Sequence, residues 1–211
     1  MFQDNPTFSV VNFAIAAYLF YIWYSDYRAN CRAGGKIRAK SLSGATPVGV
    51  VYVIFGALAS LALLAVHTIS EYSAGLAAEQ TKVSAWAFLS WTAAAFLEEL
   101  IFRGYLVIEG RGKLLLVASI VFFSLVFALC HPFMWDYTVS SDSGIFGGTW
   151  TFDFSAQPML STLAIFECSI LFYALRFLPA NRNSSLIPCI AAHLAYNWGV
   201  FAVKAAQGFI V

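Results

Sequence analysis

The stretch that decides the fold is residues 83–108, which read VSAWAFLSWTAAAFLEELIFRGYLVI and are apolar except near the middle. A membrane-spanning helix needs about 20 mainly apolar residues, and this stretch is long enough. Glu98, Glu99 and Arg103 interrupt it. Each charge at the centre of a bilayer costs roughly 2.5–3.5 kcal/mol on insertion scales. The stretch therefore predicts a membrane helix whose costly charged residues carry a function.

These three charged residues divide into a pair and a single acid. Glu99 and Arg103 are four residues apart with the acid first, so they share a helix face and can form an ion pair. Glu98 is rotated about 100° from Glu99, which leaves it without that partner and facing a polar cavity. An alternative places all three at the cytoplasmic interface, with Arg103 reaching out to water. The apolar run, however, resumes at residues 105–108.

The rest of the chain has the same apolar character. Of its 211 residues, 60% are hydrophobic and 11% are charged, whereas soluble domains carry about 25% charged residues. Gly49, Gly56 and many alanines in the second apolar stretch predict close helix packing. The sequence predicts an all-α, polytopic membrane helix bundle of about six transmembrane helices, with residues 1–211 forming a single domain. The six expected spans are residues 8–24, 46–67, 83–108, 114–131, 158–178 and 186–206.

The charged loops predict how the chain crosses the membrane. Residues 25–41 contain one acid and an excess of basic side chains, which is typical of a cytoplasmic loop. These basic residues are Arg28, Arg32, Lys36, Arg38 and Lys40. Residues 132–157 contain Asp136, Asp142 and Asp153 but no lysine or arginine, and we place them outside. We expect a multi-pass protein of the plasma or inner membrane with both termini outside, and the net charge of +1 indicates no nucleic-acid partner.

Polar residues in two other spans indicate what the acids serve. His131 closes the fourth apolar stretch, four residues after Phe127. His193 lies inside the sixth stretch, and Asn197 follows it one helical turn later on the same face. A single intramembrane histidine is often only a hydrogen-bond donor between helices. Two histidines, an acid pair and an asparagine on three helices instead favour one polar cavity within the bundle.

Such a cavity can hydrolyse a peptide bond. A carboxylate acts as general base towards water, and a histidine can hold that water. A second histidine and an amide N–H can donate hydrogen bonds to the oxyanion that forms at the scissile carbonyl. No serine, cysteine or threonine pairs obviously with a base, and the four cysteines form no Cys-x-x-Cys motif. A covalent route and a zinc–thiolate site are therefore disfavoured.

Three short motifs occur in order along the chain. They are Glu-Glu-x-x-x-Arg at 98–103, Phe-x-x-x-His at 127–131 and His-x-x-x-Asn at 193–197. Over residues of about 84–200, the chain resembles the CAAX protease and bacteriocin-processing family of glutamic intramembrane proteases. The resemblance implies an endopeptidase that uses neither a metal nor another cofactor.

The resemblance also implies a role for each matched residue. Glu98 would activate water, and His131 would bind the same water molecule. His193 and Asn197 would form the oxyanion hole. Glu99 would be a supporting acid, and Arg103 would be its structural partner.

The implied partners are the lipid bilayer and a peptide or protein substrate with a membrane-associated segment. A prenylated C-terminus, a bacteriocin-type leader and a C-terminal sorting tail all fit this description, and the sequence does not choose among them. Two alternatives stay open. One is a non-catalytic binding or immunity protein that keeps the fold. The other is a metal-dependent protease or an ion-coupled transporter, whose ligands would be Glu98, Glu99, His131 and His193.

Further features have more than one interpretation. The loop at 132–157 is rich in aromatic residues, and it forms either an aromatic belt at the membrane interface or a lid over the bundle. Glu167, in the fifth stretch, either has a function or forms a hydrogen bond to a neighbouring helix. His67 and Glu71 are four residues apart, and we interpret them as a pair at the outer interface.

Overall fold

The computed structural model describes residues 6–35, 40–139 and 147–211. Its long helices are α1 (Pro6–Arg32), α2 (Val50–Ser73), α3 (Ala87–Glu98), α4 (Lys113–Leu129), α5 (Ala156–Phe177) and α6 (Ile187–Ala206). The shorter elements are η2 (Ala77–Glu79), the π-helix η3 (Glu99–Tyr105), and the strands β1 (Trp135–Thr138) and β2 (Thr149–Phe152). The predicted all-α helical bundle is confirmed, with an antiparallel hairpin of β1 and β2 added between α4 and α5.

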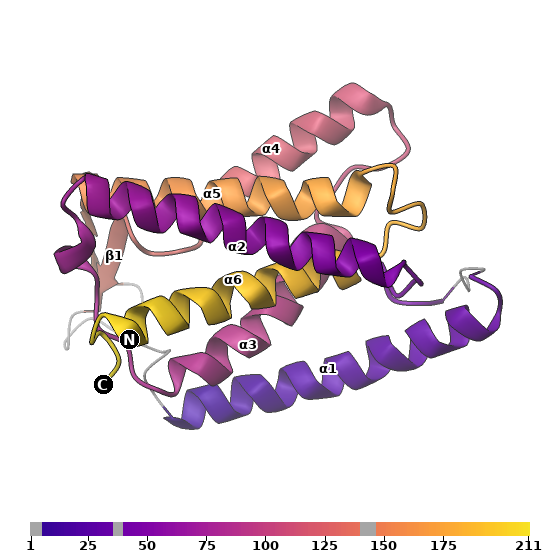
Figure 1. Ribbon diagram of the computed structural model, residues 1–211, viewed down its shortest axis with the longest axis horizontal. Helices are drawn as coiled ribbons and strands as arrows, with labels where there is room; N and C mark the ends of the chain where they lie inside the picture. The colour runs from indigo at the N-terminus through magenta and orange to yellow at the C-terminus, as the bar shows by residue number, and fades with distance from the viewer. Residues whose placement is uncertain (1–5, 36–39, 140–146) are drawn as a thin grey trace.

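Helix α6 lies in the middle of the bundle (Figure 1). It packs against α2, α3 and α5, while α1 packs on α3 and α4 packs on α5. The start of α1 and the end of α6 lie at the same end of the molecule. There, the Val83 N–H donates a 3.0 Å hydrogen bond to the Phe209 carbonyl. Distant parts of the chain therefore meet around α6, which carries two of the predicted site residues.

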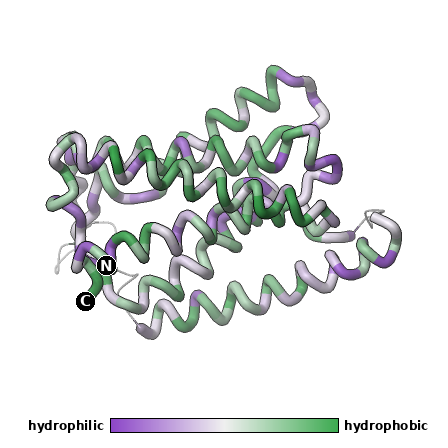
Figure 2. The backbone as a smooth tube through the Cα atoms, viewed as in Figure 1, coloured by the Kyte–Doolittle hydropathy of each residue, from purple (hydrophilic) through white to green (hydrophobic). Residues whose placement is uncertain are grey.

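The helices present mostly apolar residues along their length (Figure 2). Helices α1, α2 and α5 are long and apolar enough to cross a membrane, and α4 is a shorter apolar helix. Apolar residues on their outer faces, such as Val51 and Leu114, are exposed, which suits lipid better than water. The chain is therefore a membrane protein. The six crossings and the outward termini stay predictions, and Lys36, Arg38 and Asp142, on which the loop argument drew, lie outside the described residues.

Two predicted spans differ from the helices in the structure. The stretch at 83–108 is not one regular helix, because α3 ends at Glu98 and the chain continues as η3. Helix α4 ends at Leu129, so His131 lies in the turn that follows the helix. The apolar pattern does not predict either feature, because a π-helix or a turn can have the same amino-acid composition as an α-helix.

Helices α2 and α6 approach each other closely at glycines. A Cβ atom at Gly56 would lie 2.9 Å from the carbonyl oxygen of Pro188, at the start of α6. At Gly199, a Cβ atom would collide with a side-chain carbon of Leu64 in α2. Gly49 has open space around it. The predicted close packing is therefore confirmed at Gly56 and wrong at Gly49.

We expect Gly56→Ala to destabilise the protein by about 1–3 kcal/mol, because the added methyl group meets backbone rather than a flexible side chain. The measurement is the free energy of unfolding in mixed detergent micelles. Gly49→Ala, at the open start of the same helix, is the matched control and should change this free energy by less than about 0.5 kcal/mol. If both variants lose the same free energy of unfolding, close packing at Gly56 is not the cause of the loss.

Candidate active site

The charged motif spans the junction of α3 and the π-helix η3: Glu98 is the last residue of α3, and Glu99 and Arg103 lie on η3. The Leu106 N–H donates a 2.9 Å hydrogen bond to the carbonyl of Ile101, five residues earlier. Helix α5 supports the end of this segment: the Tyr173 hydroxyl lies 2.9 and 2.8 Å from the carbonyl oxygens of Phe102 and Leu106. Arg176, also on α5, donates to the carbonyl of Arg103. Single π-helical turns are frequent at functional sites, and here one sets the direction of Glu99 and Arg103.

Glu99 and Arg103 form an ion pair inside the bundle. Nη1 of Arg103 lies 3.2 Å from Oε1 of Glu99, and both side chains are fully buried. Nη2 of Arg103 donates to the hydroxyl of Ser169 at 2.7 Å. The guanidinium carbon lies 4.4 Å from the ring centre of Phe127 and 4.9 Å from that of Tyr173. The alternative in which Arg103 reaches out to water is therefore wrong.

His193 lies between the two glutamates. Its Nδ1 is 2.8 Å from Oε1 of Glu99, and its Nε2 is 3.8 Å from Oε2 of Glu98. The Phe172 ring stacks on the imidazole at 4.9 Å between centres. The Glu98 side chain is 29% exposed, in contrast to buried Glu99. The ionisable groups therefore form one connected series that runs from Arg103 through Glu99 and His193 to a more accessible Glu98.

His131 lies on the other side of an aromatic ring. Its Nδ1 is 2.9 Å from the carbonyl oxygen of Phe127, and a carbonyl only accepts, so Nδ1 carries the hydrogen. A neutral ring then presents Nε2 as an acceptor. The Phe127 ring centre is 4.9 Å from that of His131 and 6.2 Å from that of His193. Across the described parts of the chain, no hydrogen bond or ion pair joins His131 to Glu98 directly.

Asn197 connects α6 to the helix that carries the acids. Its amide nitrogen donates a 3.1 Å hydrogen bond to the carbonyl of Trp91 in α3. A carboxamide nitrogen carries two hydrogens, so the second remains as a donor. The structure thus brings Glu98, Glu99, Arg103 and His193 into one connected cluster. The Phe127 ring separates His131 from this cluster. Asn197 lies one turn of α6 beyond His193.

Sequence reasoning missed the residues that support this cluster. The Ser169 hydroxyl, which holds Arg103, itself donates to the hydroxyl of Ser124 in α4 at 2.9 Å. Arg176 in α5 lies 3.0 Å from Glu109 in a second ion pair. Serines are common in membrane helices, so nothing in the pattern singles out these two. Arg176 is a cation within the apolar stretch 158–178, and that signal is present in the sequence.

A second polar cluster joins α2, α5 and α6. Nε2 of His67 lies 2.8 Å from Oε2 of Glu167, and its Nδ1 lies 2.7 Å from the Tyr196 hydroxyl. Glu167 therefore has a hydrogen bond to a neighbouring helix, one of its two interpretations. The expected pairing of His67 with Glu71 is wrong, since Glu71 instead accepts a 2.5 Å hydrogen bond from Gln80.

The donor arrangement bears on the metal-binding alternative. Its four proposed ligands include Glu99, whose Oε1 already contacts both Arg103 and His193. Within residues 6–35, 40–139 and 147–211, no group of three or more histidine, cysteine, aspartate or glutamate side chains could hold a metal ion.

Together, the fold and the site define a class of protein: an α-helical membrane protein with a buried cluster of carboxylates, histidine and arginine at its centre. A family model described as Type II CAAX prenyl endopeptidase Rce1-like matches residues 80–199, a range that contains all six predicted site residues. The chain belongs to this family, as its three motifs predicted. The family comprises endopeptidases that act on protein or peptide substrates at membranes. Searches of curated proteins and of solved structures found no match.

Proposed function

We propose that the protein is an intramembrane endopeptidase in which Glu98 activates a water molecule. One observation carries the proposal: His193 lies between a buried, charge-paired Glu99 at 2.8 Å and an accessible Glu98 at 3.8 Å. Two adjacent acids with different surroundings suit two different tasks. The buried one can orient the imidazole, while the accessible one can exchange protons with water and substrate.

The proposed reaction uses both states of Glu98. The carboxylate takes a proton from water while the water oxygen attacks the scissile carbonyl carbon. His131, with Nε2 as an acceptor, would hold the same water molecule. The tetrahedral intermediate then collapses, the C–N bond breaks, and Glu98 returns the proton to the departing amine. The products are a carboxylic acid and an amine, and the enzyme regains its starting state.

The oxyanion of the intermediate needs hydrogen-bond donors. Asn197 has one amide hydrogen left after its bond to Trp91 and can supply it. His193 can donate from Nε2 only when that nitrogen carries a hydrogen, and Nδ1 already faces Glu99. With Nδ1 bonded to Glu99, donation to the oxyanion would use a hydrogen on each of the two ring nitrogens.

The proposed substrate is a peptide or protein with a membrane-associated segment next to the cleaved bond. The family description reads CAAX prenyl endopeptidase, which suits a prenylated C-terminus. Leader peptides and C-terminal sorting tails share the same chemistry of an extended peptide close to lipid. All three place a peptide bond at the membrane, where a cluster within the bundle can reach it.

The test is peptide cleavage by the purified protein in liposomes. Three forms of one peptide sequence are compared: one carries a farnesyl group, one is joined to a hydrophobic helix, and one has neither. We expect at least one of the two membrane-attached peptides to be cleaved. Its rate of cleavage should not change when EDTA or 1,10-phenanthroline is added. Loss of activity with chelator and its return with zinc would favour the metal-dependent alternative. Binding of the peptides without cleavage of any of them would favour the non-catalytic alternative.

A further inference from the structure

The hairpin between α4 and α5 has two chemically distinct faces. Strands β1 and β2 pair antiparallel, with Trp135 opposite Phe152 and Tyr137 opposite Trp150. Because alternate residues of a strand point to opposite sides, these four aromatic residues share one face, called here the aromatic face. The alternate pairs, Asp136 with Thr151 and Thr138 with Thr149, form the other side. That side carries hydroxyl groups and a carboxylate.

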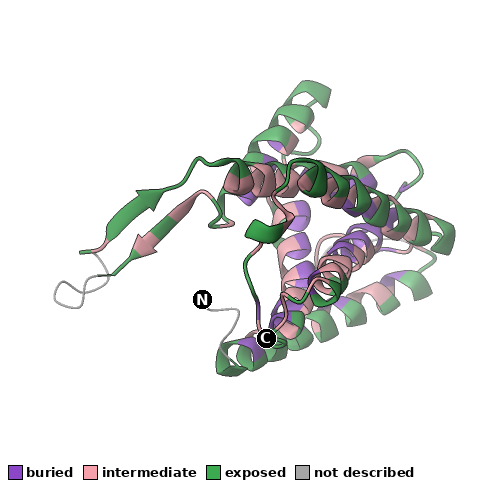
Figure 3. Ribbon diagram, turned by 60° about the vertical axis from the view of Figure 1, so that its left-hand side comes forward, coloured by how far each residue is buried: buried purple, intermediate pink, exposed green. Residues whose placement is uncertain are grey.

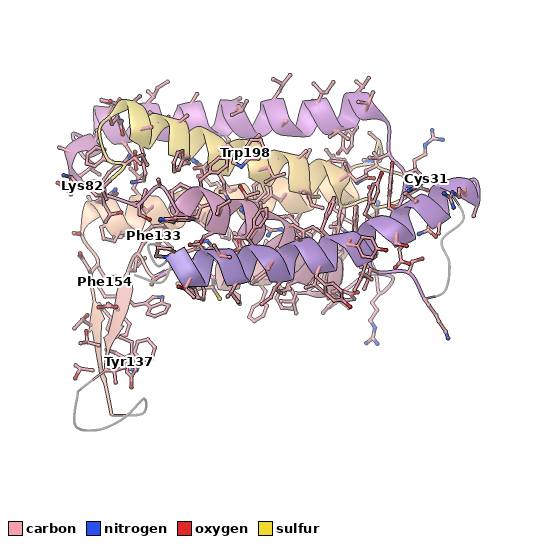
Figure 4. The ribbon with its side chains drawn as sticks, turned by 90° about the horizontal axis from the view of Figure 1, so that it is seen from below. Cys31, Lys82, Phe133, Tyr137, Phe154 and Trp198 are labelled. Carbon is pink, nitrogen blue, oxygen red and sulfur yellow. The ribbon has the colours of Figure 1, made fainter. Side chains whose placement is uncertain are left out.

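Among the described residues, the aromatic face contacts a helix at its base, where the Trp135 N–H donates a 2.8 Å hydrogen bond to the Leu129 carbonyl at the end of α4, and the β2 side of the face is exposed. Figure 3 shows the hairpin projecting from the bundle, and Figure 4 shows it running crosswise to the helices, with Phe154 near its base and Tyr137 farther out. Trp150 is 56% exposed and Phe152 64% exposed. Aromatic rings also pair within the face, with Trp135 and Trp150 at 5.4 Å and Tyr137 and Trp150 at 4.7 Å between ring centres.

An isolated two-stranded hairpin is at best marginally stable in water, so its apolar face needs a partner. Short connections limit where that partner can be. Residues 130–134 join α4 to β1, and residues 153–155 join β2 to α5. At about 3.3–3.6 Å per residue, these connections reach at most about 20 Å and about 14 Å. The hairpin therefore stays close to the ends of two apolar helices, where the bilayer meets water.

We propose that the aromatic face lies in the headgroup region of the same bilayer that holds the helices. Tryptophan and tyrosine favour this region, because an apolar ring and a polar N–H or O–H suit its two sides. A hairpin that runs crosswise to membrane helices also runs along the membrane surface. The opposite side, with Asp136 and three threonines, faces water. The contact does not depend on the chemistry proposed for Glu98.

The apolar surface of the helices continues into the hairpin. Leu129 at the end of α4 and Met159 in the first turn of α5 are exposed apolar residues. Phe133 and Phe154, in the two connections, are exposed as well. The lipid that covers the helices would therefore reach the aromatic face without a break. Residues 132–157 contain no lysine or arginine, so the contact should require no anionic lipid.

Fluorescent labels on adjacent residues test this orientation. Cys31 and Cys130 are exposed and are changed to serine, whereas Cys168 and Cys189 are buried and stay. Single cysteines are then introduced by Trp150→Cys or Phe152→Cys on the aromatic face, and by Thr149→Cys or Thr151→Cys on the other. Each carries the environment-sensitive dye NBD, in nanodiscs of phosphatidylcholine that hold one copy of the protein.

We expect labels at 150 and 152 to emit at shorter wavelength. A nitroxide near the lipid headgroup should quench them at least twofold more strongly than one deep in the acyl chain. Labels at 149 and 151 should respond to aqueous iodide instead. Equal iodide quenching on both sides would overturn the proposal. So would a shorter wavelength at 150 and 152 with no lipid quenching, since protein would then cover the face.

The unlabelled protein provides a check against damage by the substitutions. Brominated lipid should quench the tryptophan fluorescence of the wild type more than that of Trp150→Phe, because Trp150 would be one of the emitters in contact with lipid. Equal fractional quenching of the two proteins would count against the proposal even if a cysteine variant fails to fold.

Discussion

Glu98→Gln is expected to lower kcat for peptide cleavage by about 10²–10⁴-fold, the usual contribution of a general base. The amide keeps the size of the side chain but cannot take a proton from water. Because Glu98 is 29% exposed and its ionic contact is the 3.8 Å approach to His193, its loss should leave the fold intact. The measurement is the rate at saturating substrate in liposomes, together with the unfolding midpoint.

Glu167→Gln is the matched control for this substitution. Like Glu98, Glu167 is a partly exposed glutamate within a predicted span, and its side chain is 44% exposed. Like Glu98, it contacts a histidine, which is His67. Glu167 contacts His67, which in turn contacts Tyr196, and neither of these is proposed to act on substrate. We expect this variant to keep activity within about threefold of wild type, a change of less than about 1 kcal/mol in barrier height. If Glu98→Gln keeps more than a tenth of the wild-type rate, Glu98 is not the base.

Arg103→Met is expected to cost about 3–5 kcal/mol of folding stability, because it leaves the buried Glu99 carboxylate without its compensating charge. The hydrogen bond to Ser169 and the contacts with the Phe127 and Tyr173 rings are lost as well. The measurement is the free energy of unfolding in mixed micelles. Arg111→Met removes an exposed arginine from the following loop and should change it by less than about 0.5 kcal/mol.

A double variant separates a lost ion pair from lost packing. Glu99→Gln combined with Arg103→Met removes both charges, and we expect it to be more stable than Arg103→Met alone, since no uncompensated charge is left. Its activity should stay low, because a carboxylate at position 99 accepts a stronger hydrogen bond from Nδ1 of His193 than an amide oxygen does, and so orients the imidazole better. A double variant no more stable than Arg103→Met would show that packing around the guanidinium, rather than the charge of Glu99, dominates the loss.

Several features of the protein could be predicted from local regularities of the chain. An excess of apolar residues over 20-residue stretches indicates membrane helices whatever their partners are. The spacing of Glu99 and Arg103 places them on one helix face, and the ion pair is present at 3.2 Å. The three motifs identified the family, because each pairs residues only about one helical turn apart.

Other features depend on residues that are distant in the sequence. The contact of His193 with Glu99 joins residues 94 positions apart, and no local pattern reports it. The direction of Asn197 towards Trp91 depends on how α6 crosses α3. From the sequence alone, Arg103 could lie either at the membrane interface or in the interior of the helix bundle. Packing of Phe127, Tyr173 and Ser169 around it decides for the interior.

The sequence by itself determined that this is a helical membrane protein, which helices carry the charged residues, and which of those residues share a helix face. These properties depend on composition and on the helical repeat. Only the tertiary structure decided that stretch 83–108 changes from an α-helix to a π-helix at Glu99, that His193 lies between Glu98 and Glu99, and that four aromatic residues of the 132–157 loop share one face. Those properties depend on partners brought together from separate helices and strands, and on a register that folding alone sets.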